Sequence, residues 1–124
     1  MAVRRVLIID DEPYIRRILA FKLRRAGYTA LEATTGEEAM EILEHARVHC
    51  VILDVTLASP TTGFAVAETL RDDPARCRIP IVFLTARSLP SDRRRGLELG
   101  AAAYITKPFA LEEVMDAVAR LVPA

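Results

Sequence analysis

The sequence has no tryptophan, and only two of its 124 residues are cysteines and only two are lysines. Cys50 and Cys77 lack the spacing of metal ligands, so we expect two reduced, half-buried thiols, each near the start of a strand. No apolar run is long enough to cross a bilayer, and the amino-terminal residues do not resemble a secretion signal. These absences lead us to expect a cytoplasmic protein with no membrane contact.

Neither sign of charge is in excess. Seventeen lysines and arginines balance seventeen aspartates and glutamates, so the chain lacks the basic footprint of a protein that binds nucleic acid directly. Hydrophobic residues make up 52% of the chain and charged residues 27%, which is typical of a globular protein. The length suits one domain, and because we find no linker or internal repeat, we expect residues 1–124 to form it.

What the chain does contain is a regular alternation of short apolar runs and longer amphipathic segments. The patterns predict strands at residues 4–9, 28–33, 49–54, 79–85 and 101–105. They predict helices at residues 13–26, 35–46, 64–73, 90–99 and 110–121. This alternation indicates an α/β fold with a parallel sheet, right-handed crossovers and helices on both faces. We expect the basic residues of the first helix, Arg16 among them, to face solvent.

A polar residue stands at the end of four of the five predicted strands. Asp10 and Asp11 follow the first strand, and Asp54 ends the apolar run of the third. Thr85 ends the fourth strand, and Lys107 comes just after the fifth. Because the carboxyl ends of parallel strands meet at one edge of a sheet, we expect three carboxylates, a hydroxyl and an ammonium to converge there.

This combination of groups suits the transfer of a phosphoryl group. Three neighbouring aspartates repel one another and raise one another's pKa values, and a divalent cation such as Mg²⁺ or Mn²⁺ removes that conflict. Asp54 then stays ionised and can attack phosphorus to form an aspartyl phosphate. Lys107 supplies positive charge and Thr85 a hydroxyl donor for the transferred group.

Four motifs relate the chain to a known family: Val6-Leu7-Ile8-Ile9-Asp10-Asp11-Glu12, Val51-Ile52-Leu53-Asp54, Leu84-Thr85-Ala86 and Tyr104-Ile105-Thr106-Lys107-Pro108-Phe109. With these motifs the chain resembles, over essentially its whole length, the receiver domains of bacterial two-component response regulators. The resemblance implies a flavodoxin-like, or CheY-like, three-layer sandwich. Its five-stranded parallel sheet has the order 2-1-3-4-5 and is packed between five helices.

The resemblance also implies a role for each residue of the acidic site. Asp54 is similar to the phosphoryl acceptor of the family. Asp11 corresponds to a direct metal ligand, and Asp10 to a ligand that acts largely through water. The backbone carbonyl of Thr56 and the carboxylate of Asp54 would complete the metal site.

Further residues correspond to the switch of the family. Lys107 would contact the phosphoryl group, and its peptide bond to Pro108 would be cis. Thr85 would move toward a phosphoryl oxygen, and Tyr104 would turn inward behind it. An alternative for Tyr104 is simple packing in an edge strand. We also expect Arg87 and Thr56 to flank the site and to set how fast the phosphoryl group is lost.

The resemblance implies partners on two sides of the switch. A histidine kinase or a histidine phosphotransfer protein would donate the phosphoryl group. A downstream effector, or an output domain absent from this sequence, would bind the face made by the fourth helix, fifth strand and fifth helix. The chain would catalyse only its own phosphorylation and dephosphorylation, so we do not expect an enzyme that acts on other substrates. The alternative is a receiver-like interaction module that works without phosphorylation.

Two departures from the family pattern stand out. Ala58 occupies the usual place of a proline after the acceptor, and Gly63 comes one residue late, so the loop at 57–63 is one residue longer. One subgroup of the family dimerises through paired acids and bases. This chain has Ala102, Ala103 and Ala117 at the corresponding places, so we predict that it forms no dimer of that salt-bridged kind.

Overall fold

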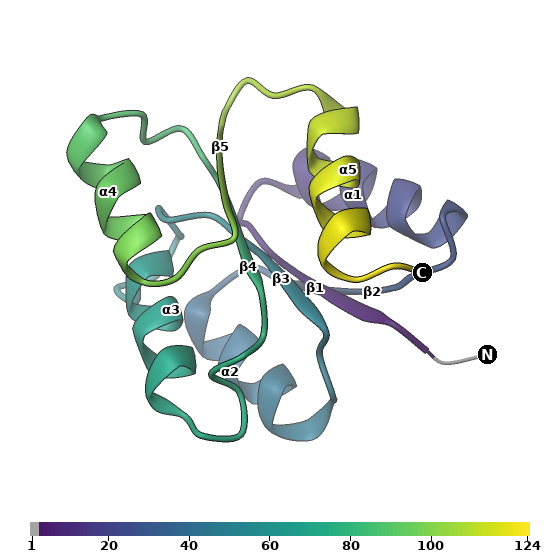
Figure 1. Cartoon of the computed structure of the whole chain (residues 1–124), viewed down its shortest axis with the longest axis horizontal. Helices are drawn as coiled ribbons and strands as arrows, with labels where there is room; N and C mark the ends of the chain where they lie inside the picture. Colours follow the sequence, from purple (N-terminus) through teal and green to yellow (C-terminus); the bar gives the residue numbers. More distant parts are fainter. Residues whose placement is uncertain (1–2) are drawn as a thin grey trace.

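The computed structural model describes residues 3–124, in which five strands alternate with five helices (Figure 1). In chain order the elements are β1 (Arg5–Ile9), α1 (Pro13–Arg25), β2 (Thr29–Ala33), α2 (Gly36–His45), β3 (Cys50–Leu53), α3 (Gly63–Asp72), β4 (Ile81–Thr85), α4 (Pro90–Glu98), β5 (Ala103–Thr106) and α5 (Leu111–Leu121). All strand pairs are parallel, and the sheet order is β2-β1-β3-β4-β5. The predicted α/β class and strand order are confirmed.

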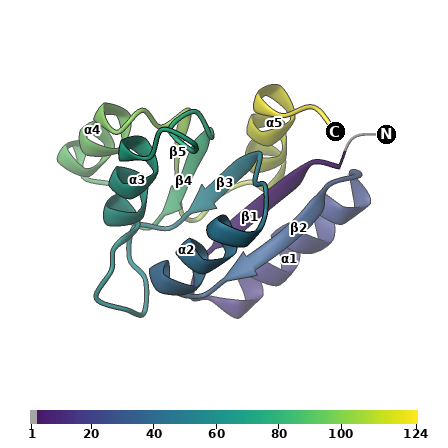
Figure 2. The ribbon, with the colours of Figure 1, turned by 90° about the horizontal axis from the view of Figure 1, so that it is seen from below.

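The helices cover both faces of the sheet (Figure 2). Helices α1 and α5 lie on one face, and α2, α3 and α4 lie on the other. A parallel sheet covered on both sides needs strands that are apolar on both sides. This explains why the central strands β1, β3 and β4 are nearly continuous runs of buried Val, Ile, Leu and Phe.

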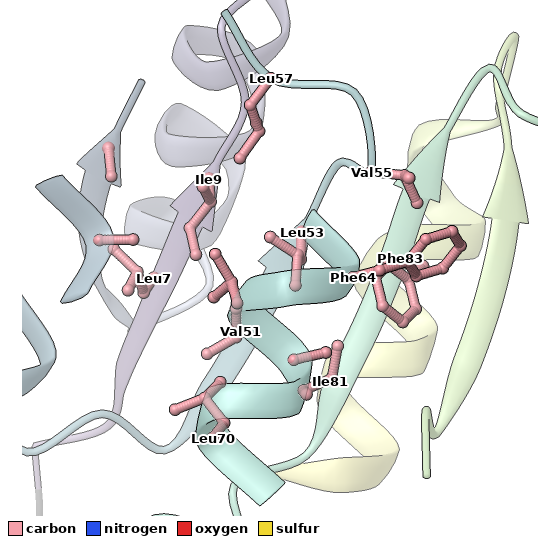
Figure 3. Close-up of a cluster of buried hydrophobic side chains, with 14 of the residues drawn as sticks. Leu7, Ile9, Val51, Leu53, Val55, Leu57, Phe64, Leu70, Ile81 and Phe83 are labelled. Carbon is pink, nitrogen blue, oxygen red and sulfur yellow. The ribbon is translucent and has the colours of Figure 1, made fainter. Parts of the chain in front are cut away.

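Alternate residues of each strand therefore enter two different cores. Leu7, Leu53 and Phe83 belong to the core under α2 and α3, where the Phe83 ring meets that of Phe64 edge-on at 5.5 Å (Figure 3). Their neighbours Ile52 and Val82 belong to the core under α1 and α5. These two cores fix the register of the sheet, because a slip by one residue would exchange the two sets.

Several predicted strand boundaries are wrong by one or two residues. The fourth strand begins at Ile81 because Pro80 has no N–H to donate; only its carbonyl takes part, accepting from Val51 at 3.0 Å. The fifth strand begins later than predicted, at Ala103, and includes Thr106. Cys50 is fully buried rather than half-buried, whereas Cys77 is partly exposed in the connection from α3 to β4.

None of the helices in the described part of the chain is both long and apolar enough to span a membrane.

Candidate functional site

Two aspartates are buried at the carboxyl ends of neighbouring strands. Asp10 follows β1 and Asp54 follows β3, with side chains only 3% and 6% exposed. Each residue continues the hydrogen bonding of the sheet by one step. The Asp10 N–H donates to Ala33 at 3.1 Å, and the Asp54 N–H donates to Ile9 at 2.9 Å. The sheet itself thus holds both carboxylates side by side, as the strand-end argument predicts.

The ammonium of Lys107 joins these acids. Its Nζ donates to Asp10 Oδ2 at 2.9 Å, to Asp54 Oδ2 at 2.9 Å and to Glu12 Oε1 at 2.8 Å. The backbone of Lys107 is fixed as well, because its N–H donates to the carbonyl of Thr85 at 2.9 Å. One cation faces three carboxylates, so the cluster keeps an excess of negative charge. The peptide bond between Lys107 and Pro108 is cis, as the family resemblance implies.

Burial and hydrogen bonding shift the pKa values of this cluster in opposite senses. Burial is the largest cause that raises the pKa of Asp10, while bonds from the Glu12 N–H and from Lys107 oppose it. Repulsion by Asp54 also raises the pKa of Asp10, as the sequence predicts, but it contributes less than burial. Burial alone would lower the pKa of Lys107, but its bonds to the three carboxylates raise it overall. The lysine is therefore firmly protonated.

The carboxylates form a donor set that suits a divalent cation. Oxygens of Asp10, Glu12 and Asp54 all lie within 4.8 Å of one another. Carboxylate oxygen is the ligand that Mg²⁺ and Mn²⁺ prefer, so the residues fit such an ion. Asp11 is not in this group, which contains Glu12 in its place. The direct ligation by Asp11 and by the carbonyl of Thr56 stays a prediction.

Glu12 belongs to the site, although the sequence pattern did not predict it. It precedes α1, and its N–H donates to Asp10 Oδ1 at 2.9 Å, which folds the chain back over the strand end. Its side chain can then reach Lys107 although the residue itself is exposed. The available signal was the acidic run from Asp10 to Glu12 directly before Pro13, because proline is favoured as the first residue of a helix and Glu12 must then lie in the turn that leads into it.

Arg16 was also missed. It was expected to face solvent, but its side chain is only 15% exposed and its Nη1 donates to the carbonyl of Asp10 at 2.8 Å. Its Nε lies 3.5 Å from a carboxylate oxygen of Glu32 in β2. Arg16 therefore ties α1 to the strand end that carries Asp10. Its basic neighbours in the sequence hide this role, because periodicity alone assigns it to the wet side of the helix.

Thr85 and Tyr104 are both buried, and both bond to Arg87. The Thr85 hydroxyl oxygen accepts from the Arg87 N–H at 3.3 Å, and the Tyr104 hydroxyl donates to the Arg87 carbonyl at 2.7 Å. The Arg87 guanidinium pairs with Asp92 at the start of α4, at 3.0 Å. The connection from β4 to α4 thus links the residue at the strand end to β5 and α4.

The ring of Tyr104 already lies inside the protein, with 4% exposure. It packs 5.8 Å from the ring of Phe83, and the Arg93 guanidinium lies over it at 5.6 Å. Gly96 makes room for it, since a Cβ at that position would lie 2.8 Å from the Tyr104 ring. No inward turn is needed to reach this position, so packing, the alternative for Tyr104, is part of its role here.

The longer loop after β3 projects from the body of the protein (Figure 2). It still returns to the site, because Gly63 donates its N–H to Val55 at 2.8 Å. A Cβ at Gly63 would lie only 2.0 Å from the carbonyl oxygen of Asp54. Glycine is therefore required at this contact. Asp54 and Thr56 also stay close together, with the Thr56 N–H donating to Asp54 Oδ1 at 3.2 Å.

Residues 6–119 match the family model of the response regulator receiver domain. The chain belongs to this family. A solved receiver domain, the chemotaxis protein CheY4 of Vibrio cholerae, superimposes with a TM-score of 0.89 at 30% identity, covering 98% of this chain and 100% of that one.

Longer relatives share only part of their length with this receiver domain. It is 42% identical to a probable transcriptional regulator, ycf27, of Porphyridium aerugineum, over 92% of this chain and 46% of that protein. It is 39% identical to the phosphate regulon transcriptional regulatory protein PhoB of Pseudomonas aeruginosa, over 98% of this chain and 51% of that protein. The chain thus spans about half the length of these two relatives.

Proposed function

We propose that this receiver domain is a phosphorylation-controlled signalling switch in which Asp54 accepts a phosphoryl group from a phosphorylated histidine. The strongest support is the set of contacts between Lys107 Nζ and the carboxylates of Asp10, Glu12 and Asp54, at 2.8–2.9 Å. The contacts support the proposal because the carboxylate that would act as nucleophile lies beside a fixed cation at the carboxyl edge of the sheet. The donor would be a histidine kinase or a histidine phosphotransfer protein, the usual partners of receiver domains.

In the proposed reaction, an Asp54 carboxylate oxygen attacks phosphorus as the bond from phosphorus to the histidine nitrogen breaks. The imidazole, protonated on its other nitrogen, leaves as a neutral ring. Lys107 already touches Asp54 and can follow the negative charge onto the transferred group. Thr85, fully buried at the end of β4, offers its hydroxyl to a phosphoryl oxygen.

A bound Mg²⁺ or Mn²⁺ would neutralise negative charge shared by the carboxylates and the phosphoryl group. The residues that would hold the ion are Asp10, Glu12 and Asp54, whose oxygens lie close together, and the resemblance adds Asp11 and the carbonyl of Thr56. Two hydrogen bonds would keep Asp10 in place: Arg16 donates to its backbone carbonyl, and the Glu12 N–H donates to its Oδ1.

The switch would operate through the connection between β4 and α4. If Thr85 turns its hydroxyl to a phosphoryl group, the contact with the Arg87 N–H at 3.3 Å changes. Arg87 also contacts Tyr104 and Asp92, so the change would reach α4 and β5. Because Tyr104 is already inside, phosphorylation would stabilise that position rather than create it. A few kcal/mol of differential stabilisation is enough for such a shift.

Two surfaces would serve the two kinds of partner. A cavity of about 570 Å³ beside Lys107, with Tyr14, Ile15 and Phe109 in its wall, would receive the phosphohistidine donor. The face made by α4, β5 and α5 would bind an effector or an output domain. Leu89 and Leu97 support that assignment, since they are 62% and 52% exposed at the two ends of α4.

The test is the intact mass of the chain after incubation with a small acyl phosphate, with and without Mg²⁺. We expect one added phosphoryl group on the wild type and on Asp72→Asn, a control at an exposed aspartate of α3, and none on Asp54→Asn. Labelling should also require the metal. Decay of the added mass would measure dephosphorylation by the chain itself. If the wild type gains no mass, the switch proposal fails, and the alternative of an interaction module without phosphorylation takes its place.

A further inference from the structure

A second hollow lies at the opposite end of the sheet from Asp54. It has a volume of about 530 Å³ and is bounded by the connections from α2 to β3 and from α3 to β4. Figure 1 shows both connections at the lower edge of the molecule, away from the loops that follow the strands. We call it the amino-end cavity, and its lining residues are Leu43–His49, Ala75, Arg76 and Arg78–Pro80.

The charged side chains around this cavity are mostly basic. Arg47, Arg76 and Arg78 line it, and Glu44 is the single acid among the lining residues. The charge of Arg47 also affects His49, which lines the cavity too. Its pKa is lowered first by burial and then by the charges of Arg4, Arg47 and Arg5. Basic residues therefore continue from the cavity to Arg4 and Arg5 at the start of β1.

Two of the three arginines have no partner among residues 3–124. Arg76 is engaged, because its Nε and Nη2 donate to the Leu43 carbonyl at 3.0 and 2.8 Å and its Nη1 pairs with Asp73. Arg47 and Arg78 are exposed, and neither makes a salt bridge or a side-chain hydrogen bond in this part of the chain. Their guanidinium N–H groups are free to bind an anion.

The inner wall of the cavity is firm and partly apolar. Val48 is buried, and Ile79 and Pro80 are half-buried. Pro80 accepts from Val51 at 3.0 Å, and the His49 Nδ1 accepts from the Arg5 N–H at 3.0 Å. Hydrogen bonds at Pro80 and at His49 therefore tie this side of the cavity to the sheet. A ligand could place an anionic group on the arginines and a less polar part against this wall.

We propose that the amino-end cavity binds a small molecule that carries phosphate groups, with Arg47 and Arg78 as its main anchors. The forked N–H groups of arginine match the oxygens of phosphate and can bind two at once. The volume lies within the range of small-molecule sites. This site is separate from Asp54, so it does not depend on the proposed phosphorylation switch.

The experiment is a titration of the ¹⁵N-labelled chain with inorganic tripolyphosphate and, separately, with ATP, both in EDTA to prevent metal-dependent binding at the acidic site. We expect amide shifts at residues 45–49 and 75–79. Arg47→Ala combined with Arg78→Ala should weaken binding at least about tenfold, the scale of losing charged hydrogen bonds. The control, Arg17→Ala combined with Arg94→Ala, removes two exposed arginines elsewhere and should change affinity less than about twofold.

Two results would overturn the proposal: shifts spread over all exposed arginines, or equal loss of affinity in both double variants. Equal affinity for tripolyphosphate and ATP would assign the site to polyphosphate itself. Tighter binding of ATP would assign it to a nucleotide whose ring rests on the wall of Val48, Ile79 and Pro80.

Discussion

At the carboxyl end of the sheet, the ammonium of Lys107 bonds three carboxylates. At the amino end, the guanidinium of Arg71 instead bonds main-chain carbonyls. The four acceptors are Leu99 at 2.8 Å, Cys77 at 2.8 Å, Ile79 at 2.9 Å and Gly100 at 3.1 Å. Both residues are single cations that close one end of the same sheet. They differ in whether their partners are charged.

This difference separates a permanent contact from a changeable one. Carbonyls cannot lose or gain a proton, so Arg71 holds the connections before β4 and β5 under all ordinary conditions. The partners of Lys107 are acids that can be protonated, can bind a cation, or, at Asp54, can be phosphorylated in the proposed reaction. Of these two cations, the one with fixed bonds lies at the amino end, and the one with changeable bonds lies at the carboxyl end, where ligands of open α/β sheets bind.

The largest effect is expected from removing the permanent cation. Arg71→Ala leaves four carbonyls without their donor, so we expect the free energy of unfolding to fall by about 3 kcal/mol in urea titrations. Arg71→Lys restores the charge but not the planar set of guanidinium N–H donors, so it should recover only part of the lost free energy of unfolding. Phosphorylation of Asp54 by an acyl phosphate should persist in whatever fraction stays folded. An unchanged midpoint in Arg71→Ala would show that water replaces the guanidinium without loss.

A smaller loss of stability and a larger change of chemistry are expected at the other end. Lys107→Met removes the hydrogen-bonded counter-ion of buried Asp10 and Asp54, and we expect a loss of about 2 kcal/mol without divalent cations. Mg²⁺ should stabilise this variant more than the wild type, because the ion would take over neutralisation of the acids. Labelling of Asp54 should slow at least about tenfold.

The control for Lys107→Met is Lys22→Met on the exposed side of α1. It should alter neither unfolding nor labelling. Equal stabilisation of the wild type and Lys107→Met by Mg²⁺ would contradict the idea that lysine and metal share the same carboxylates.

Most of the fold follows from the sequence because its periodicity is strong. The apolar runs ending at Ile9, Leu53 and Leu84 fix three central strands, and the alternating helices then leave one class of topology. The same logic brings Asp10 and Asp54 together. Both placements depend only on where a strand ends, which a local pattern reveals.

The parts that the sequence did not reveal depend on side chains that reach across the structure. Arg71 and Arg16 look like ordinary basic residues of amphipathic helices, yet each bonds a carbonyl of another segment. Glu12 joins the site through a turn rather than through a strand. The inward position of Tyr104 in β5 depends on the space left by Gly96 in α4. No sequence pattern connects these two residues. Such contacts are decided by three-dimensional packing, which periodicity does not describe.

The smallest expected effect concerns the protonation of Asp10. Its pKa is raised above the ordinary value of 3.8, so the folded chain holds this proton more tightly than the unfolded chain does. The contribution to stability is fully present below pH 3.8 and is lost as the pH rises through the folded pKa. Asp10→Asn removes this loss and should raise the free energy of unfolding at pH 7 by about 1 kcal/mol. The gain should shrink as urea titrations are taken down toward pH 4. The matched variant Asp72→Asn, at an exposed position, should show no such trend with pH. If the gain in stability of Asp10→Asn is the same at every pH, its cause is packing and not charge.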